Sequence, residues 1–83
     1  MTNNYFCTYD LGLAAGLLSS GFEICEITKP EPTRLRFKFE NTDELQTAID
    51  DYFLDKLNVS ARMMFDNLKM LKNKLFNSRP YEQ

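Results

Sequence analysis

Residues 33–40 read Thr-Arg-Leu-Arg-Phe-Lys-Phe-Glu, and charged and apolar side chains alternate from Arg34 to Glu40. Because successive side chains of a strand point to opposite faces, the alternation predicts a β-strand with one apolar face and one basic face. The apolar face carries Leu35, Phe37 and Phe39. The basic face carries Arg34, Arg36 and Lys38. Three large apolar groups need a cover, so we expect the rest of the chain to supply one.

The residues before this strand predict two further strands and a helix. Residues 5–9 and 22–28 are rich in β-formers, and an apolar segment over 11–20 separates them. Residues 29–32, Lys-Pro-Glu-Pro, predict a rigid turn, because proline fixes φ and removes a ladder donor. The second and third strands are therefore expected to form a hairpin.

Capping residues bound the first helix. Asp10 is a suitable N-cap, and Gly21 suits the left-handed position after the last turn. Gly12 and Gly16 each cost about 1 kcal/mol relative to alanine inside a helix. They also give the helix a small-residue face, which predicts close packing on a neighbouring element.

Two amphipathic helices are predicted in the C-terminal half. The first runs over 42–56, with a capping box of Asn41 and Glu44. Its predicted core face consists of Leu45, Ala48, Ile49, Tyr52 and Phe53. The second runs over 61–76 and is capped by Ser60. Its predicted core stripe consists of Ala61, Met64, Phe65, Leu68, Leu71 and Leu75.

The order of these elements predicts an α+β fold, β-α-β-β-α-α. A strand, a helix and a strand imply a right-handed crossover between two parallel strands. The third strand is the most regular and apolar, so we place it in the middle. We therefore predict a three-stranded mixed sheet, covered on one face by helices. The chain is read as a single domain, 1–83, with an ordered core over about 4–76 and a loose tail over 77–83.

Composition argues against catalysis. The 83 residues contain no histidine, which removes the commonest general base and the imidazole metal ligands. Two cysteines, Cys7 and Cys25, are too few for a zinc site and are expected to be reduced core residues of an intracellular protein. We expect no enzyme activity, no cofactor and no metal.

No membrane or targeting segment is predicted either. The apolar stretch Leu11–Leu18 has eight residues, whereas a transmembrane helix needs about 20. The protein is therefore expected to be cytoplasmic.

Several motifs resemble one family of small proteins. They are Tyr9-Asp10-Leu11-Gly12-Leu13-Ala14-Ala15 after an aromatic strand, Asp51-Tyr52, Val59-Ser60-Ala61-Arg62, Phe65, and Leu71-Lys72-Asn73-Lys74-Leu75. The chain resembles, over about residues 4–76, bacterial, cyanobacterial and phage proteins with a single domain of unknown function. It departs from them over 52–55, where the family has a tryptophan or polar residues and often a glycine. The resemblance implies one fold and no particular reaction, cofactor or partner.

The basic strand face is the first candidate site. Arg34, Arg36 and Lys38 place cations about 7 Å apart, near the spacing of phosphates along a nucleic-acid strand. Tyr5 or Tyr9 on a neighbouring strand could add a stacking surface. The alternative is that the open face of a one-layer sheet is simply polar, and we favour that interpretation because the acidic helix weakens an attractive field.

A charge split between the two C-terminal helices is the second candidate. Residues 40–55 contain six acids and no base, and residues 56–79 contain six bases and one acid. A basic last helix would present Arg62, Lys69 and Lys72 to a phosphate backbone. The alternative, which we favour, is that the two helices attract each other within one molecule or between two copies.

A second apolar stripe is the third candidate. Met63 and Met70 are seven residues apart and fall nearly opposite the predicted core stripe, and Leu54 lies outside the core face of its helix. Such a stripe predicts a second packing partner, and we assign it to self-association.

Two functional hypotheses follow. The first is a small homo-oligomeric interaction or regulatory module that uses the last two helices. The second is a nucleic-acid-binding accessory protein that uses the basic strand face and the basic last helix.

Overall fold

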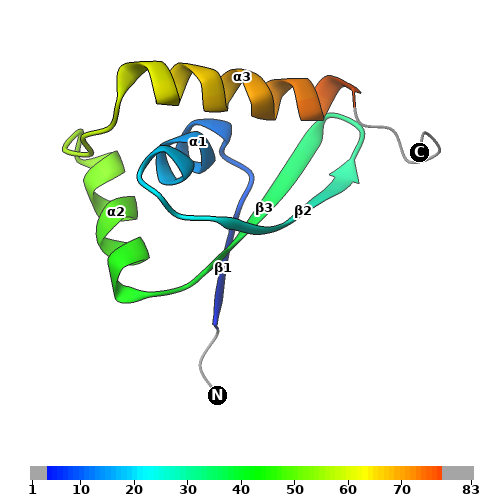
Figure 1. Ribbon diagram of the computed structural model, residues 1–83. Coiled ribbons are helices and arrows are strands. Elements are labelled where there is room, and N and C mark those ends of the chain that lie inside the picture. The colour runs from blue at the N-terminus through cyan, green and yellow to red at the C-terminus, as the bar shows by residue number, and fades with distance from the viewer. Residues whose placement is uncertain (1–3, 78–83) are drawn as a thin grey trace.

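A computed structural model describes residues 4–77, and its elements follow the predicted order β-α-β-β-α-α (Figure 1). The elements are β1 (Tyr5–Thr8), α1 (Leu11–Ser19), β2 (Ile24–Glu31), β3 (Arg34–Glu40), α2 (Asp43–Phe53) and α3 (Ala61–Asn77). The predicted tail lies outside the described residues from position 78 onward. The α+β class is confirmed.

Strand β3 lies in the middle of the sheet, as the alternation of its side chains predicted. The strand order is β1-β3-β2. Leu35, Phe37 and Phe39 are buried, and Phe37 and Phe39 are fully inaccessible. The most apolar strand takes the central position because it then packs against helices on one face and has strand neighbours on both edges.

The sheet is antiparallel throughout, so the predicted mixed sheet is wrong. β1 pairs with β3 through Phe6 opposite Phe39, and β2 pairs with β3 through Ile27 opposite Phe37, both antiparallel. β1 and β2 therefore run in the same direction, as a strand-helix-strand unit requires, but they do not pair. The hairpin strand β3 lies between them and takes the hydrogen bonds of both.

Strand β2 begins two residues later and ends three residues later than predicted, so it includes part of the expected turn. It continues through Lys29 and Pro30 to Glu31, and only residues 32–33 form the turn. Proline is tolerated here because β2 is an edge strand, where one side of the backbone has no partner strand. The register shifts between Thr28 and Glu31 where β2 passes Pro30.

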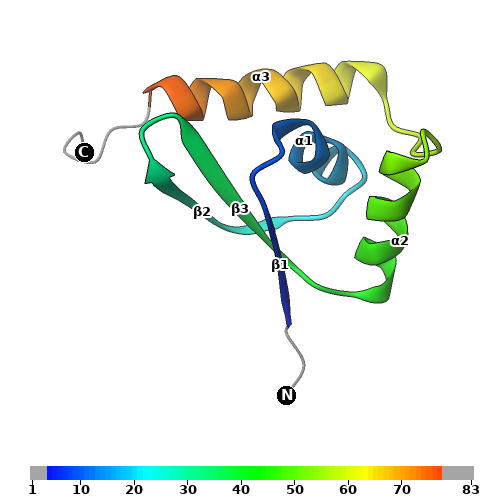
Figure 2. The same cartoon turned by 180° about the vertical axis from the view of Figure 1, so that it is seen from behind.

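Helix α1 occupies the centre of the molecule, with α3 across one side of it and α2 along another (Figures 1 and 2). Its residues 13–17 are all buried. The predicted caps are confirmed: Asp10 Oδ1 accepts from the Leu13 amide at 3.1 Å, and Gly21 has φ 103°. The helix is continuous through both of its glycines.

The glycines of α1 make room for Tyr52 of α2. A Cβ at Gly12 would lie 2.5 Å from the Tyr52 hydroxyl oxygen. A Cβ at Gly16 would lie 3.4 Å from Cδ1 of the Tyr52 ring and 3.3 Å from Leu57. The small-residue face is therefore a packing surface for α2 and for the segment that follows it.

The cap of α2 differs from the predicted capping box. Thr42 is the N-cap, and its Oγ1 accepts from the Leu45 amide at 3.1 Å. Asn41 instead accepts from the Gln46 side-chain amide at 2.8 Å. Threonine and asparagine are both capping residues, so sequence alone did not distinguish neighbouring positions. The helix ends at Phe53, earlier than predicted, because Asp55 takes a left-handed conformation with φ 61°.

Helix α3 packs on α1 through a narrower stripe than predicted. Ser60 Oγ accepts from the Met63 amide at 3.3 Å, which confirms the predicted cap. The side chains that pack on the core are Met64, Leu68, Leu71 and Leu75. Ala61 and Phe65 are exposed, and so is Phe53 on α2, so their predicted core positions are wrong. Phe65 lies about 120° around the helix from the buried Leu71, beyond the reach of α1.

Side-chain hydrogen bonds also join α3 to α1 and β2. The Asn67 side-chain amide donates to Ser19 Oγ of α1 at 3.0 Å. The Lys29 ammonium of β2 donates to the Leu75 carbonyl at 2.9 Å, near the C-terminal end of α3. A cation at this end of a helix provides a hydrogen bond to a free carbonyl and interacts favourably with the negative end of the helix dipole.

Candidate functional site

On the side of the sheet turned away from the helices, the basic face of β3 contacts side chains of β1 and of the residue that follows it. We call this surface the ladder; it consists of Arg34, Arg36, Lys38, Tyr5, Cys7 and Tyr9. The Lys38 ammonium lies 4.5 Å from the centroid of the Tyr5 ring. The Arg34 guanidinium carbon lies 4.1 Å from the centroid of the Tyr9 ring. Tyr5 and Tyr9 remain 44% and 45% exposed. The predicted cations and tyrosines therefore share one surface, with the row of cations beside the row of tyrosines.

Between the two stacked pairs, a guanidinium meets a thiol. Arg36 Nη2 donates to Cys7 Sγ at 3.3 Å. Cys7 is half-buried and Cys25 is exposed, and both are free thiols. The predicted core positions of both cysteines are therefore wrong. Cys7 lies opposite Lys38, on the polar face of the sheet, and Cys25 lies in the irregular stretch between Ile24 and Glu26 of the edge strand β2. Cys7 instead completes the ladder.

Carboxylates accompany two of the three cations. The Lys38 ammonium lies 3.2 Å from Glu26 Oε1, and Arg34 Nη1 lies 3.9 Å from Glu31 Oε2. Because both pairs are largely exposed to solvent, each contributes little to stability. They do reduce the positive potential of the ladder, which limits its attraction for phosphates.

The candidate self-association residues are all exposed. The described large apolar side chains of the C-terminal half with the highest exposure are Phe53 at 63%, Leu54 at 61%, Met63 at 48%, Phe65 at 67%, Met70 at 41% and Phe76 at 74%. Leu54, Met63 and Met70 were identified from the sequence. The three phenylalanines were not: Phe53 and Phe65 were assigned to the core, and Phe76 was considered only as the end of the last helix.

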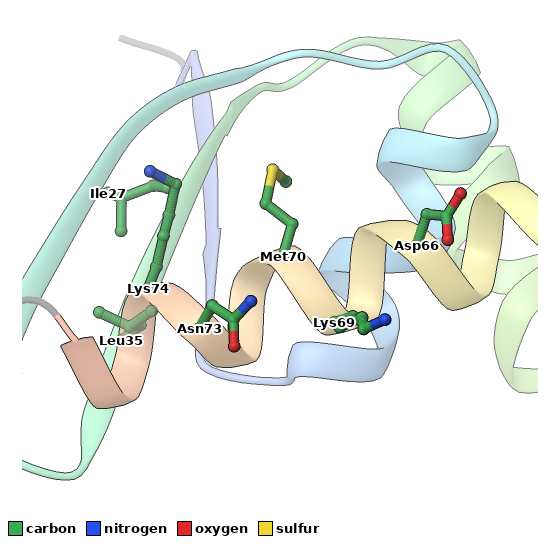
Figure 3. Close-up of a pocket in the computed structure, with 7 residues that line it drawn as sticks. All are labelled: Ile27, Leu35, Asp66, Lys69, Met70, Asn73 and Lys74. Atoms are coloured by element: carbon green, nitrogen blue, oxygen red, sulfur yellow. The ribbon is translucent and has the colours of Figure 1, made fainter.

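Met70 borders a groove between α3 and the β2-β3 hairpin (Figure 3). The groove has a volume of about 750 Å³, and its apolar lining is Ile27, Leu35 and Met70. Its polar lining is Asp66, Lys69, Asn73 and Lys74. The side chains of Met70 and Lys74 point from α3 to the side of the helix where Ile27 of β2 lies (Figure 3). The groove thus offers a small apolar floor beside cationic side chains.

A second surface of α3 faces away from the core. Its residues recur at i, i+3, i+7, i+10 and i+14 and are all exposed: Arg62, Phe65, Lys69, Lys72 and Phe76. We call this set the outward stripe. The Lys69 ammonium lies 5.8 Å from the centroid of the Phe65 ring. The regular spacing is visible in the sequence, and it could have identified the stripe if Phe65 had not been assigned to the core.

The sequence-predicted cations therefore form two separate rows. Arg34, Arg36 and Lys38 belong to the ladder, and Arg62, Lys69 and Lys72 belong to the outward stripe. No ion pair or ring contact within residues 4–77 joins the two rows.

Tyr52 is a titratable group with a perturbed environment. Burial of the phenol raises its pKa above the ordinary value, and the nearby Asp10 carboxylate raises it further. Perturbed groups often mark functional sites, but packing of Tyr52 against the glycines of α1 accounts for this shift.

Two features are absent from the described residues. Positions 4–77 contain no group of three or more His, Cys, Asp or Glu side chains placed to hold a metal ion. No helix within the same range combines the length and the apolar character needed to cross a membrane.

Comparison with known proteins identifies a family. Residues 3–77 match the family described as Domain of unknown function (DUF5659). No curated protein and no solved structure is significantly similar to the chain. The match covers nearly all of the sequence and includes every helix and strand described above, so the chain belongs to the DUF5659 family.

Proposed function

We propose that this protein is a small, non-enzymatic interaction module that forms homo-oligomers through α3 and the end of α2. The proposal rests on the apolar side chains that the fold leaves uncovered between residues 53 and 76. It retains the contact residues Leu54, Met63 and Met70 and adds Phe53, Phe65 and Phe76.

The exposed apolar surface is the observation that carries this proposal. The core is complete without these six side chains, since Phe37, Phe39 and Leu71 are fully buried by other residues. Their exposed area is on the order of 700 Å² together, divided between the side of α3 that carries Met63 and Met70 and the side that carries Phe65 and Phe76. A standard interface takes roughly 800 Å² from each partner, so the two sides together offer an area of that order. A domain of this size has little stability to spare, so burying this surface in an oligomer would also stabilise the fold.

Sedimentation at high micromolar concentration tests the proposal. The wild-type chain is expected to sediment as a dimer or larger species, and Met63→Lys and Phe65→Lys are expected to shift it toward the monomer. Asn4→Lys adds the same charge at an exposed position just before β1, whose N-terminal end points away from α3 (Figure 1), and serves as the matched control. A wild-type monomer whose mass is unchanged by Met63→Lys would exclude self-association through α3.

A second function, nucleic-acid binding, is supported by one arrangement. The ladder combines exposed aromatic rings, Tyr5 and Tyr9, with cations stacked on them, and single-strand-binding sheets use the same two components. A role as an accessory protein in bacteria or phages would suit such a surface, although that setting rests on the family resemblance. The carboxylates of Glu26 and Glu31 beside the cations count against strong binding.

Fluorescence anisotropy with a labelled single strand tests this second function. Binding is expected at low salt and should weaken steeply as salt is raised, because phosphate contacts release counterions. Tyr9→Leu and Arg34→Gln should each reduce binding, whereas Lys56→Gln, outside both cation rows, should not. Absence of binding at low salt would eliminate this hypothesis.

A further inference from the structure

The outward stripe of α3 combines positive charge with large apolar side chains. Arg62, Lys69 and Lys72 alternate with Phe65 and Phe76 along about 21 Å of helix. The stripe is exposed, and none of its cations forms an ion pair with an acidic side chain among residues 4–77. A surface of this composition requires a partner that is both acidic and partly apolar.

Helix α2 presents the complementary composition. It contains four acids, Asp43, Glu44, Asp50 and Asp51, and no base. Three of them are exposed, and exposed apolar residues follow directly at the end of the helix, at Phe53 and Leu54. At about 16 Å, α2 is long enough to cover most of the outward stripe.

The two helices do not satisfy each other within one molecule. Both ion pairs within residues 4–77, Lys38–Glu26 and Arg34–Glu31, lie in the sheet. Tyr52 of α2 packs on α1, and the buried stripe of α3 also packs on α1, so α1 lies between them. The predicted attraction between the acidic α2 and the basic α3 is therefore not realised as ion pairs within one molecule. The other predicted form, a contact between α2 and α3 of two copies, remains.

We propose that the acidic surface of α2 in one copy binds the outward stripe of α3 in the next copy. This inference rests on the proposed self-association and specifies which surfaces meet. α2 and α3 lie along different sides of the molecule (Figure 1). The contact joins two different surfaces, α2 of one copy and α3 of the next, and we call it the head-to-tail contact. Made once between two copies, it builds a ring or an open chain; made reciprocally, it closes a two-fold dimer.

Salt dependence gives the first test. Exposed charges more than about 10 Å apart are largely screened at 0.1 M ionic strength, and closer surface pairs also weaken as salt rises. Sedimentation of the wild-type chain should therefore show a smaller average mass at 0.5 M sodium chloride than at 0.05 M. Association that is equal or stronger at high salt would show that apolar contacts alone hold the copies together and would overturn the head-to-tail assignment.

Charge reversal gives the decisive test. One variant carries Lys69→Glu with Lys72→Glu, and the other carries Glu44→Lys with Asp50→Lys. Each alone should associate at least about tenfold more weakly than the wild type, because like charges then meet across the contact. A mixture of the two variants should associate again, since each reversed helix finds an opposite charge on the other protein.

Two controls accompany the charge reversals. Circular dichroism must show that each variant is folded. The pair Glu23→Lys with Glu40→Lys changes net charge as the α2 variant does, but on exposed residues outside α2 and α3, and should leave association unchanged.

The possible results separate the two proposals. If the wild-type chain is monomeric at every salt concentration, both the proposed self-association and this inference fail. If it associates but the reversed variants associate equally well, or if their mixture does not associate, self-association stands and the head-to-tail contact is wrong.

Discussion

Helices α1 and α3 contact each other, yet their apolar residues play opposite parts. In α1 five consecutive residues, 13–17, are buried, so nearly every side of the helix is in contact with protein. In α3 Leu71 is fully buried, whereas Phe65 is 67% exposed and Phe76 is 74% exposed. The difference shows that α1 is committed to the fold and that α3 has a free side available for another molecule.

Truncation of one side chain in each helix should give the largest contrast. Leu17→Ala should lower the free energy of unfolding by about 2–5 kcal/mol, because Leu17 is fully buried and its loss leaves a cavity. Phe65→Ala should change it by no more than about 0.5 kcal/mol in the monomer. Urea denaturation at low micromolar concentration measures both. A large effect of Phe65→Ala that grows with protein concentration would place Phe65 in an interface between copies.

The close contact of α1 with α2 should give the next largest effect. Gly12→Ala places a methyl group against the Tyr52 hydroxyl and should cost about 1–3 kcal/mol, as overpacking does. In a Tyr52→Phe background the hydroxyl is gone, so the same substitution should be neutral or stabilise by up to about 1 kcal/mol through helix propensity. A double-mutant cycle measures this coupling. Equal costs in both backgrounds would show that the hydroxyl is not the obstacle.

Tyr52 should also make stability depend on alkaline pH. Its pKa is raised in the folded protein by burial and then by Asp10, so the folded state keeps the proton to higher pH than the unfolded chain does. Above about pH 10, the ordinary tyrosine pKa, the folded state therefore binds more protons, and the free energy of unfolding falls as pH rises. Below that pH this contribution is fully present.

Comparison with Tyr52→Phe isolates the contribution of this phenol. All other residues are the same in the two proteins, so the difference between the two stability curves reports on Tyr52. That difference should be constant below about pH 9 and should change above it, with the wild type losing more stability. Parallel curves up to pH 11 would show that the phenol has the same pKa in both states.

Local patterns predicted most of the fold. The alternation in β3 identified the central strand and its buried face because a period of two leaves no ambiguity about which side chains share a face. Asp10, Gly21 and Ser60 were predicted as helix-end residues because each meets a chemical need of a helix terminus. The pairing of β1 was not predictable in the same way. Strand direction follows from the connection, but the neighbour that takes the hydrogen bonds depends on where the hairpin inserts.

The candidate sites were harder to predict, and α3 shows why. Apolar residues extend from Leu71 through Leu68 to Phe65, an arc wider than the surface that α1 can cover. Periodicity defines the arc but not its centre, because the centre depends on the position of the neighbouring helix. The ladder was predicted in part: the cations were assigned to one face, and their stacking on Tyr5 and Tyr9 depended on the register of β1.

The turns that follow α1 and α2 both contain a residue with positive φ, but the residue type differs. This difference gives the smallest predicted effect. α1 ends at Gly21, which adopts positive φ without steric cost, whereas the turn after α2 uses Asp55 at φ 61°. A left-handed conformation costs an L-residue about 1 kcal/mol, and glycine gives back part of this as chain entropy. Asp55→Gly should therefore raise the free energy of unfolding by about 0.5 kcal/mol, measured by thermal or urea denaturation. Asp55→Asn is the control, since it removes the charge but keeps a side chain at positive φ, as aspartate does. If asparagine stabilises as much as glycine, repulsion from the acidic α2 is the cause, and backbone strain before α3 is not.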